Sequence, residues 1–276
     1  MSIVFFKDKF IDESDALVSI NDRSFRFGDG VFETLLVVNS KIFDFERHLE
    51  RLKNGLKDFF IDLDVSNLEN ICTELVAKNQ LATGYLRVIV SRGLNGPGSI
   101  GYLPRNCEAY LVVQSFEKEL ADFRELNLWL SSYKAFTKPS SKTNSSANYL
   151  LSMLEADRNS CDNALILDHE DYICETASAN IFWFKDDILY TPESSLAFVP
   201  GTVQEKIMDL YETEIIVGKF KLSDIQDADE VFMTNIGCLL AGIITIKAEK
   251  GMIYQSNSDF TKSLALRKKL LDMLLG

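Results

Sequence analysis

Apolar positions in the first 116 residues follow two different periods. Short runs of β-branched and aromatic residues predict strands, at 3–6, 31–38, 85–91 and 109–115. Leucines and phenylalanines that recur every three or four residues predict helices, at about 44–60 and 65–78. Gly28 and Gly30 punctuate the turn-rich stretch between the first two strands. This part of the chain is therefore predicted to form an α+β unit.

A charged stretch at 117–126 interrupts the apolar pattern and is the expected domain boundary. Beyond it, short apolar runs predict strands at 126–132, 164–167, 172–174, 179–184, 188–190, 214–217, 231–234 and 242–246. Helices are expected at about 147–158, at about 201–210 after a proline, and at the end of the chain. The pattern thus predicts a smaller α+β domain (1–116), a linker (117–126) and a larger α/β domain (127–276).

Composition narrows the class of protein. The 276 residues are 46% hydrophobic and 25% charged, which favours a packed globular core. A formal charge of −12 argues against a nucleic-acid surface, because phosphate backbones bind clustered Lys and Arg. The five cysteines show neither metal-ligand nor disulfide spacing, which favours a reducing cytoplasm and no bound metal. No run approaches 18 apolar residues, so no membrane span is expected.

Common catalytic and nucleotide motifs are missing or out of context. Residues 96–101 spell G-x-G-x-x-G, but a strand rather than a helix is expected after them, so dinucleotide binding is not predicted. The chain has two histidines, His48 in a charged helix and His169 in a turn, and both are expected at the solvated surface. Lysine is therefore the natural candidate for nucleophilic or base chemistry, since a desolvated lysine amine forms Schiff bases.

Lys142 alone, in the polar stretch SSKTNSS, has the character of an exposed loop lysine. Four motifs at fixed distances change that interpretation: DRSFRFGDGVFET at 22–34, FERHLERL at 45–52, NALILD at 163–168 and ETASANIFW at 175–183. Together they resemble the class IV aminotransferases, a family that includes branched-chain aminotransferases, D-amino-acid aminotransferases and 4-amino-4-deoxychorismate lyases. The resemblance extends over nearly the whole chain.

The resemblance implies specific roles around pyridoxal 5′-phosphate (PLP). Lys142 would hold the cofactor as a Schiff base, whereas Lys134 and Lys138 fit the family spacing poorly. Glu175 would keep the pyridine nitrogen protonated, so that the ring can accept electrons. Arg47 would pair with the phosphate through its planar guanidinium, and Arg51 is expected at the surface.

Backbone amides would complete the phosphate site in this family. The expected donors are Gly201, Thr202 and Val203 at a helix start and, more weakly, Asn235 and Ile236 in a later loop. The sequence departs from the family here, because Val203 replaces a common hydroxyl residue and Gln204 a common arginine. Only amide contacts and the Thr202 hydroxyl are therefore expected.

The family runs both lyase and transaminase reactions, and the residues favour the lyase. Thr34 stands where lyases carry a hydroxyl, which could relay a proton, although a threonine in a strand is also ordinary. Arg92 and Tyr102 belong to stretches that resemble the lyase SRG…GY loop, although Ile100 replaces the arginine that precedes GY in lyases. Against the lyase, Tyr85 and Arg87 fit the Tyr-x-Arg with which some transaminases hold a carboxylate. Arg87, Arg92 and Tyr102 are the expected substrate contacts.

The resemblance also implies an architecture and partners. It implies the two-domain fold-type IV architecture of PLP enzymes (D-amino-acid aminotransferase-like), with the cofactor between the domains, and a homodimer. The leading function is a 4-amino-4-deoxychorismate lyase of folate biosynthesis, which acts on a small amine that carries carboxylates. The alternatives are a class IV aminotransferase of the branched-chain or D-amino-acid type and a non-catalytic PLP-binding homologue.

Overall fold

A computed structural model describes residues 2–94, 107–135 and 141–275. Internal contacts divide the chain into two compact units. The first unit comprises Met1–Leu120 and Ser141–Ser146, and the second comprises Ala121–Ser140 and Ala147–Gly276. The division after Leu120 falls inside the expected linker, 117–126. The short segment Ser141–Ser146, which contains Lys142, belongs to the first unit, whereas the sequence pattern had assigned it to the second.

The first unit is built on a six-stranded antiparallel sheet in the order β2-β1-β6-β5-β3-β4. Its strands are β1 (Ile3–Phe6), β2 (Lys9–Asp12), β3 (Gly30–Val38), β4 (Lys41–Ile42), β5 (Gly84–Ser91) and β6 (Tyr110–Glu117). Its helices are η1 (Glu13–Asp15), α1 (Arg23–Phe27), α2 (Phe45–Asp58) and α3 (Leu68–Lys78). The four strands and two helices predicted for this part of the chain are confirmed.

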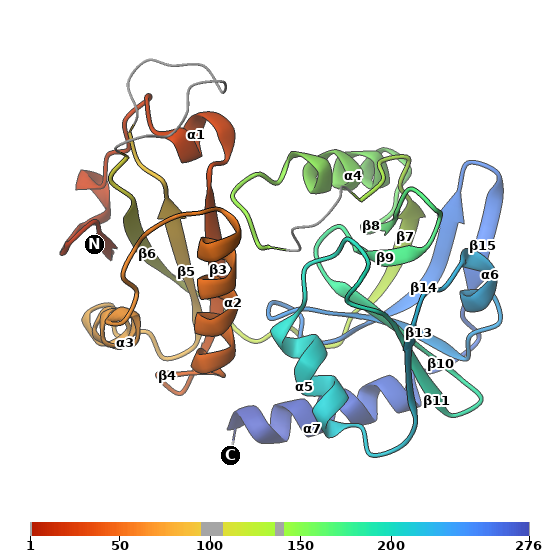
Figure 1. The fold of residues 1–276 in the computed structure, drawn as a ribbon. Coiled ribbons are helices and arrows are strands. Elements are labelled where there is room, and N and C mark those ends of the chain that lie inside the picture. Colours follow the sequence, from red (N-terminus) through yellow and green to blue (C-terminus); the bar gives the residue numbers. More distant parts are fainter. Residues whose placement is uncertain (1, 95–106, 136–140, 276) are drawn as a thin grey trace. The chain divides into compact units, whose positions relative to one another are not determined.

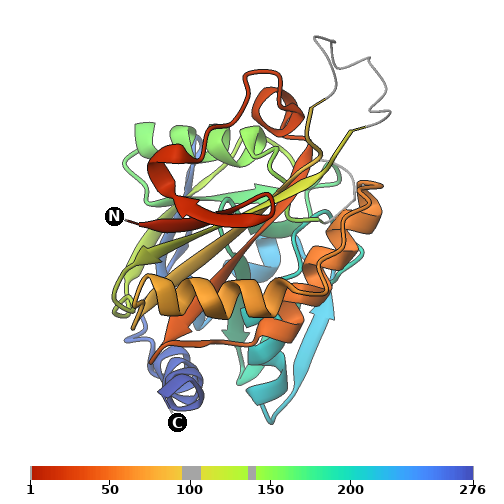
Figure 2. The same ribbon diagram turned by 90° about the vertical axis from the view of Figure 1, so that its left-hand side faces the viewer.

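Helices α2 and α3 cover one face of this sheet (Figures 1 and 2). Leu52 of α2 and Leu75 of α3 share a buried apolar cluster with Val31 and Leu35 of β3. Successive side chains of a strand point to opposite faces of the sheet. The half-exposed Phe32 and Thr34 therefore lie on the other face of β3, away from the helices.

The second unit contains a nine-stranded mixed sheet in the order β12-β11-β10-β13-β14-β7-β8-β9, with β15 paired to β14. Its strands are β7 (Glu125–Leu130), β8 (Asn163–Leu167), β9 (Ile173–Thr176), β10 (Asn180–Lys185), β11 (Ile188–Pro192), β12 (Ile215–Gly218), β13 (Glu230–Thr234), β14 (Ala241–Ala248) and β15 (Gly251–Gln255). Its helices are α4 (Ala147–Arg158), α5 (Thr202–Leu210), α6 (Leu222–Ile225) and α7 (Thr261–Leu275). The eight strands predicted here are all present.

Central strands of the second unit are buried on both faces. In β10, Ile181 and Trp183 enter one apolar cluster, while Phe182 and Phe184 enter another that includes residues of α5 and α7. This double burial explains why the strand has a continuous apolar sequence instead of an alternating one. Strand β10 is thereby enclosed between two apolar clusters.

Short elements escaped the sequence pattern. The sequence pattern did not predict strands β2, β4 and β15 and helix α6, which have at most five residues each. Helix α1 lies in a stretch expected to be a turn; the Asp22 side chain caps it, and Gly28 ends it with a φ of 66°. In the described ranges, every helix is too short or too polar to cross a membrane.

Candidate functional site

Lys142 lies in a short segment that extends the first sheet. The backbone N–H of Phe32 donates a hydrogen bond of 2.9 Å to the carbonyl of Lys142, and Thr143 forms an antiparallel bridge with Val31. The Lys142 Nζ lies 4.5 Å from the centroid of the Phe32 ring. The lysine is only partly exposed. It is therefore placed by backbone pairing with β3 and is not a freely solvated loop residue.

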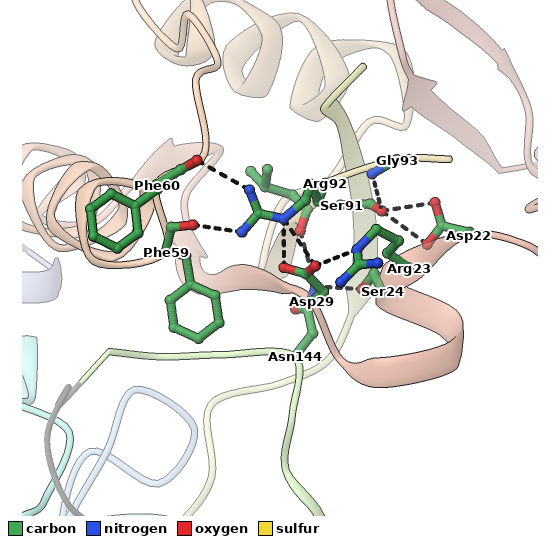
Figure 3. Close-up of polar contacts among 11 residues, drawn as sticks. Asp22, Arg23, Ser24, Asp29, Phe59, Phe60, Ser91, Arg92, Gly93 and Asn144 are labelled. Carbon is green, nitrogen blue, oxygen red and sulfur yellow. Dashed lines mark hydrogen bonds and ion pairs between the residues drawn. The ribbon is translucent and has the colours of Figure 1, made fainter. Parts of the chain in front are cut away.

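Asn144 fastens the same segment to the sheet. Its side-chain amide donates to the Ser24 hydroxyl at 2.7 Å (Figure 3). The same amide donates to the Val90 carbonyl at 3.0 Å, and the backbone N–H of Asn144 donates to the carbonyl of Gly30 at 3.0 Å. A Cβ at Gly30 would collide with the Val90 carbonyl and the Asn144 amide. Glycine at position 30 is thus required for the close approach that holds the lysine segment.

A buried ion-pair network lies next to these contacts. Asp29 accepts hydrogen bonds from Arg23 at 2.7 Å and from Arg92 at 2.8 Å (Figure 3). The other two guanidinium nitrogens of Arg92 donate to the backbone carbonyls of Phe59 and Phe60. Charge-assisted hydrogen bonds of this kind are stronger than neutral ones. The network ties the turn after α1 to the end of β5 and to the chain beyond α2.

Among the three expected substrate contacts, Arg87 is placed best for that role. Every nitrogen of the Arg92 guanidinium is engaged in the network around Asp29, so Arg92 has little remaining capacity for a ligand. Tyr102 lies outside the described residues. Arg87 differs, because its Nε is buried without a hydrogen-bond partner among the described residues.

Arg87, Thr34 and Phe32 share one face of the first sheet. Thr34 is directly opposite Arg87 in the register of β3 and β5, and Tyr85 lies two residues before Arg87 on the same face. The Arg87 guanidinium carbon lies 5.1 Å from the centroid of the Phe32 ring, the same ring that Lys142 approaches. Burial lowers the pKa of Arg87. This face thus presents a lysine amine, a hydroxyl and a partly desolvated guanidinium, a combination suited to an anionic substrate.

Helix α2 carries both arginines considered for the phosphate. Arg47 lies near the start of the helix, with its Nε 3.5 Å from a carboxylate oxygen of Asp44, and its side chain is 29% exposed. Arg51 lies one turn later and is 16% exposed. The expectation that Arg51 is a surface residue is therefore wrong.

Arg51 belongs to a buried charged cluster with Glu33 and His48. Glu33 accepts two hydrogen bonds of 2.7 Å from Arg51, and its carboxylate lies 2.9 Å from Nδ1 of His48. Burial raises the pKa of Glu33, but the charge and hydrogen bonds of Arg51 and the hydrogen bond of His48 outweigh burial and lower it to about 2. His48 is 1% exposed, so the prediction of a solvated His48 is also wrong, whereas His169 is exposed as predicted. The cause is Glu33, which β3 directs toward α2.

Glu175 is a buried carboxylate of the second unit. It lies in β9, is 4% exposed, and accepts a hydrogen bond of 2.6 Å from the Tyr149 hydroxyl. The backbone N–H of Val199 donates to it at 3.3 Å. The sequence motif identified Glu175 but gave no sign of Tyr149, which lies in α4 and reaches Glu175 only through the fold.

The start of α5 fits the expected phosphate amides. Gly201 is the N-terminal cap, and Thr202 and Val203 are the first helical residues. A Cβ at Gly201 would collide with the side-chain oxygen of Asn180, so this position requires glycine. Gln204, which replaces the common arginine, accepts a hydrogen bond of 3.2 Å from the Gly201 amide. As a rule, the first amides of a helix are suited to bind an anion.

The second expected pair of amides lies in a tight turn after β13. The Asn235 side chain donates to the carbonyl of Ser178 at 2.9 Å and accepts from the amides of Gly237 and Cys238 at 2.8 Å. These contacts fix the backbone of Asn235 and Ile236. The Asn235 side chain is used by the turn, so its contribution to a phosphate would come from the backbone.

The groups that hold PLP in enzymes are present in this chain. In the first unit, a lysine amine suits the aldehyde of the cofactor, and arginine side chains suit its phosphate. In the second unit, a helix N-terminus also suits the phosphate, and a buried carboxylate suits the ring nitrogen. Among the described residues, no group of three or more His, Cys, Asp or Glu is placed to hold a metal ion.

Comparisons with known proteins agree with these features. Residues 30–246 match the family model described as Amino-transferase class IV. A putative branched-chain-amino-acid aminotransferase of Methanocaldococcus jannaschii is 26% identical over 88% of this chain and 87% of its own length. An aminodeoxychorismate lyase of Vibrio harveyi is 28% identical over 86% of this chain and 90% of its own length.

A solved structure shows the same fold. The branched-chain amino acid aminotransferase from T.th., solved with pyridoxamine 5′-phosphate, superimposes with a TM-score of 0.89 and 23% identity, over 99% of this chain and 94% of the other. The predicted two-domain fold-type IV architecture is thereby confirmed.

The chain belongs to the class IV aminotransferase family. It is a PLP-dependent enzyme of that family, and its relatives include both lyases and aminotransferases. The cofactor predicted from the motifs is confirmed.

Proposed function

We propose that this enzyme is a 4-amino-4-deoxychorismate lyase, which releases pyruvate and forms 4-aminobenzoate for folate biosynthesis. The observation that carries the proposal is the position of Thr34. Its side chain shares a sheet face with Phe32, whose ring lies beside the Lys142 amine. A hydroxyl on the side of the lysine is suited to relay a proton during the elimination of pyruvate. The similarity to the Vibrio harveyi lyase supports the same function.

In this proposal each residue has one task. Lys142 would hold PLP as a Schiff base, and its free amine would take the proton from the substrate carbon that bears nitrogen. PLP, when bound, supplies an electron sink. Glu175 keeps the ring nitrogen protonated, and Arg87 binds a substrate carboxylate.

The phosphate is assigned to the arginines of α2 together with backbone amides. The proposed donors are Arg47 and the amides of Gly201, Thr202, Val203, Asn235 and Ile236. Arg51 is the alternative arginine, because Glu33 holds its guanidinium in a fixed orientation. Arg47→Gln should raise the Kd for PLP about tenfold, as expected for loss of one charge-assisted contact. An unchanged Kd, with a raised Kd in Arg51→Lys, would transfer the role to Arg51.

The aminotransferase remains the second candidate, and one observation favours it. Tyr85 and Arg87 lie on the sheet face that Lys142 approaches, where a Tyr-x-Arg pair could hold the carboxylate of an amino acid. A branched-chain or D-amino acid would then donate its amino group to a 2-oxo acid. A non-catalytic PLP-binding homologue is the third candidate, and it has no need of the amine of Lys142.

A side-by-side assay separates the three candidates. The purified enzyme should form pyruvate and 4-aminobenzoate from aminodeoxychorismate, with no transfer from L- or D-amino acids to 2-oxoglutarate. The reverse pattern would establish the aminotransferase, and no turnover of either kind would establish the binding homologue.

A pair of lysine variants tests the position of the cofactor. Lys142→Ala should abolish the visible band of bound PLP and its sensitivity to borohydride. Lys134→Ala is the matched control, because Lys134 forms an ion pair with the exposed Asp171 and should retain the band. A Lys142→Ala protein that stays yellow and borohydride-sensitive would overturn the assignment of Lys142.

We also propose that the enzyme is a cytoplasmic homodimer. All five cysteines are free thiols, which suits a reducing compartment. Sedimentation velocity of the PLP-loaded protein should give twice the chain mass of 31.2 kDa.

A further inference from the structure

Tyr149 is joined to Glu175 by a short hydrogen bond inside the second unit. The phenol oxygen lies 2.6 Å from Oε1 of Glu175. The ring of Tyr149 packs against a buried apolar cluster that includes Leu196 and Phe198. The phenol is thus held by packing on its ring and by the carboxylate at its hydroxyl.

A second donor approaches the same carboxylate from the chain before α5. The amide of Val199 lies 3.3 Å from Oε2 of Glu175 and 3.4 Å from Oε1. Val199 follows Phe198 of the apolar cluster and precedes the cap residue Gly201 by two positions. The carboxylate is therefore oriented by α4 on one side and by the segment that leads into α5 on the other.

Tyr149 acts as the donor in this pair at neutral pH. Burial raises the pKa of Tyr149, and the charge of Glu175 and the hydrogen bond to it raise it further. The phenol therefore stays protonated, and the carboxylate oxygen accepts. A neutral donor stabilises the carboxylate without cancelling its charge, in contrast to Arg51 beside Glu33.

We propose that Tyr149 is a positioning residue, which holds the charged carboxylate of Glu175 in the orientation that pairs with the protonated ring nitrogen of PLP. The inference rests on the proposed role of Glu175. Tyr149 would act through Glu175 and would not touch the reacting atoms. Its loss should therefore change the electronic state of bound PLP more than the binding of substrate.

Tyr149→Phe tests the inference, because it removes one hydroxyl and keeps the ring. The pH titration midpoint of the visible band of bound PLP should shift, the Kd for PLP should rise about tenfold, and kcat should fall about tenfold at an unchanged KM. Tyr172→Phe is the matched control, since Tyr172 packs against the same apolar cluster. The centroid of its ring lies 3.8 Å from Nζ of Lys221. The control should leave spectrum, Kd and kcat unchanged.

A double-variant cycle separates an action through Glu175 from general loosening of the fold. Tyr149→Phe should have no further effect on the band when Glu175→Gln is already present. An unchanged titration midpoint in Tyr149→Phe, or an equal further shift in the double variant, would overturn the inference.

The wild-type results distinguish this inference from the proposed function. An enzyme without lyase activity whose PLP band still responds to Tyr149→Phe refutes the lyase and supports the inference. An enzyme with lyase activity whose PLP band does not respond to Glu175→Gln supports the proposed function and refutes the inference.

Discussion

Glu33 of the first unit and Glu175 of the second unit are both buried, but different kinds of partner stabilise them. Glu33 is 2% exposed and forms two hydrogen bonds to the guanidinium of Arg51. Glu175 is 4% exposed and accepts hydrogen bonds from uncharged groups, the Tyr149 phenol and the Val199 amide. A buried carboxylate needs such partners, because burial in an apolar environment penalises its charge.

The comparison sets a carboxylate that joins two elements of the fold against the carboxylate that we propose pairs with PLP. The guanidinium of Arg51 forms a bidentate ion pair with Glu33, which neutralises the carboxylate and joins β3 to α2. The Tyr149 phenol and the Val199 amide instead orient the carboxylate of Glu175, as its proposed pairing with the ring nitrogen of PLP requires. Three predictions test this comparison, from the largest expected effect to the smallest.

Glu33→Gln should destabilise the fold by about 3–5 kcal/mol, because it removes the buried carboxylate that pairs with Arg51. Urea unfolding measures the loss. Glu74→Gln is the control, since Glu74 forms an exposed ion pair with Lys78 and its loss should cost less than about 1 kcal/mol. If Glu33→Gln and Glu74→Gln had the same free energy of unfolding, the Glu33 cluster would contribute no more to stability than an exposed ion pair.

Acid should remove the contribution of Glu33 over a defined interval. Its pKa is lowered from an ordinary value of 4.5 to about 2, so its stabilising effect is complete above pH 4.5 and disappears as the pH falls toward 2. The difference between these two pKa values corresponds to about 3 kcal/mol of folding free energy. The stability advantage of wild type over Glu33→Gln should therefore shrink across this interval. A constant difference between the two proteins would contradict the assignment.

Glu175→Gln should reduce kcat on the order of 100-fold, as for the loss of one preorganised electrostatic group. Its unfolding midpoint should change little, because glutamine has the same shape and can still accept from Tyr149. Steady-state kinetics and thermal unfolding on the same preparation measure both quantities. If kcat and the unfolding midpoint both fall, Glu175 would be a structural carboxylate like Glu33.

Long elements of the fold could be predicted from the sequence because burial repeats along them. The helices at 45–58 and 68–78 show this repeat, and the central strands of the second sheet show continuous apolar runs instead. Helix α1 could not be predicted in this way, since one aspartate cap and one glycine define it within five residues. Strand β4 has two residues and no period at all.

The sequence motifs predicted which residues form the candidate site, but they did not predict which side chains contact these residues. Spacing identified Lys142 and Glu175 as the residues that match the family pattern. The motif around Arg47 gave no sign that His48 is buried and Arg51 partly buried, because their partner Glu33 lies on a different element. Tyr149 likewise has no motif that links it to Glu175, 26 residues away.

The sequence by itself determined the family, the cofactor and the residues that match the family motifs, because these depend on residue types at fixed spacing. The tertiary structure alone decided which charges are buried, which donors orient Glu175, and that the segment of Lys142 pairs with the start of β3. The physical reason is that burial and hydrogen bonding depend on distances in space. Residues far apart in the sequence meet only when the sheets and helices have formed.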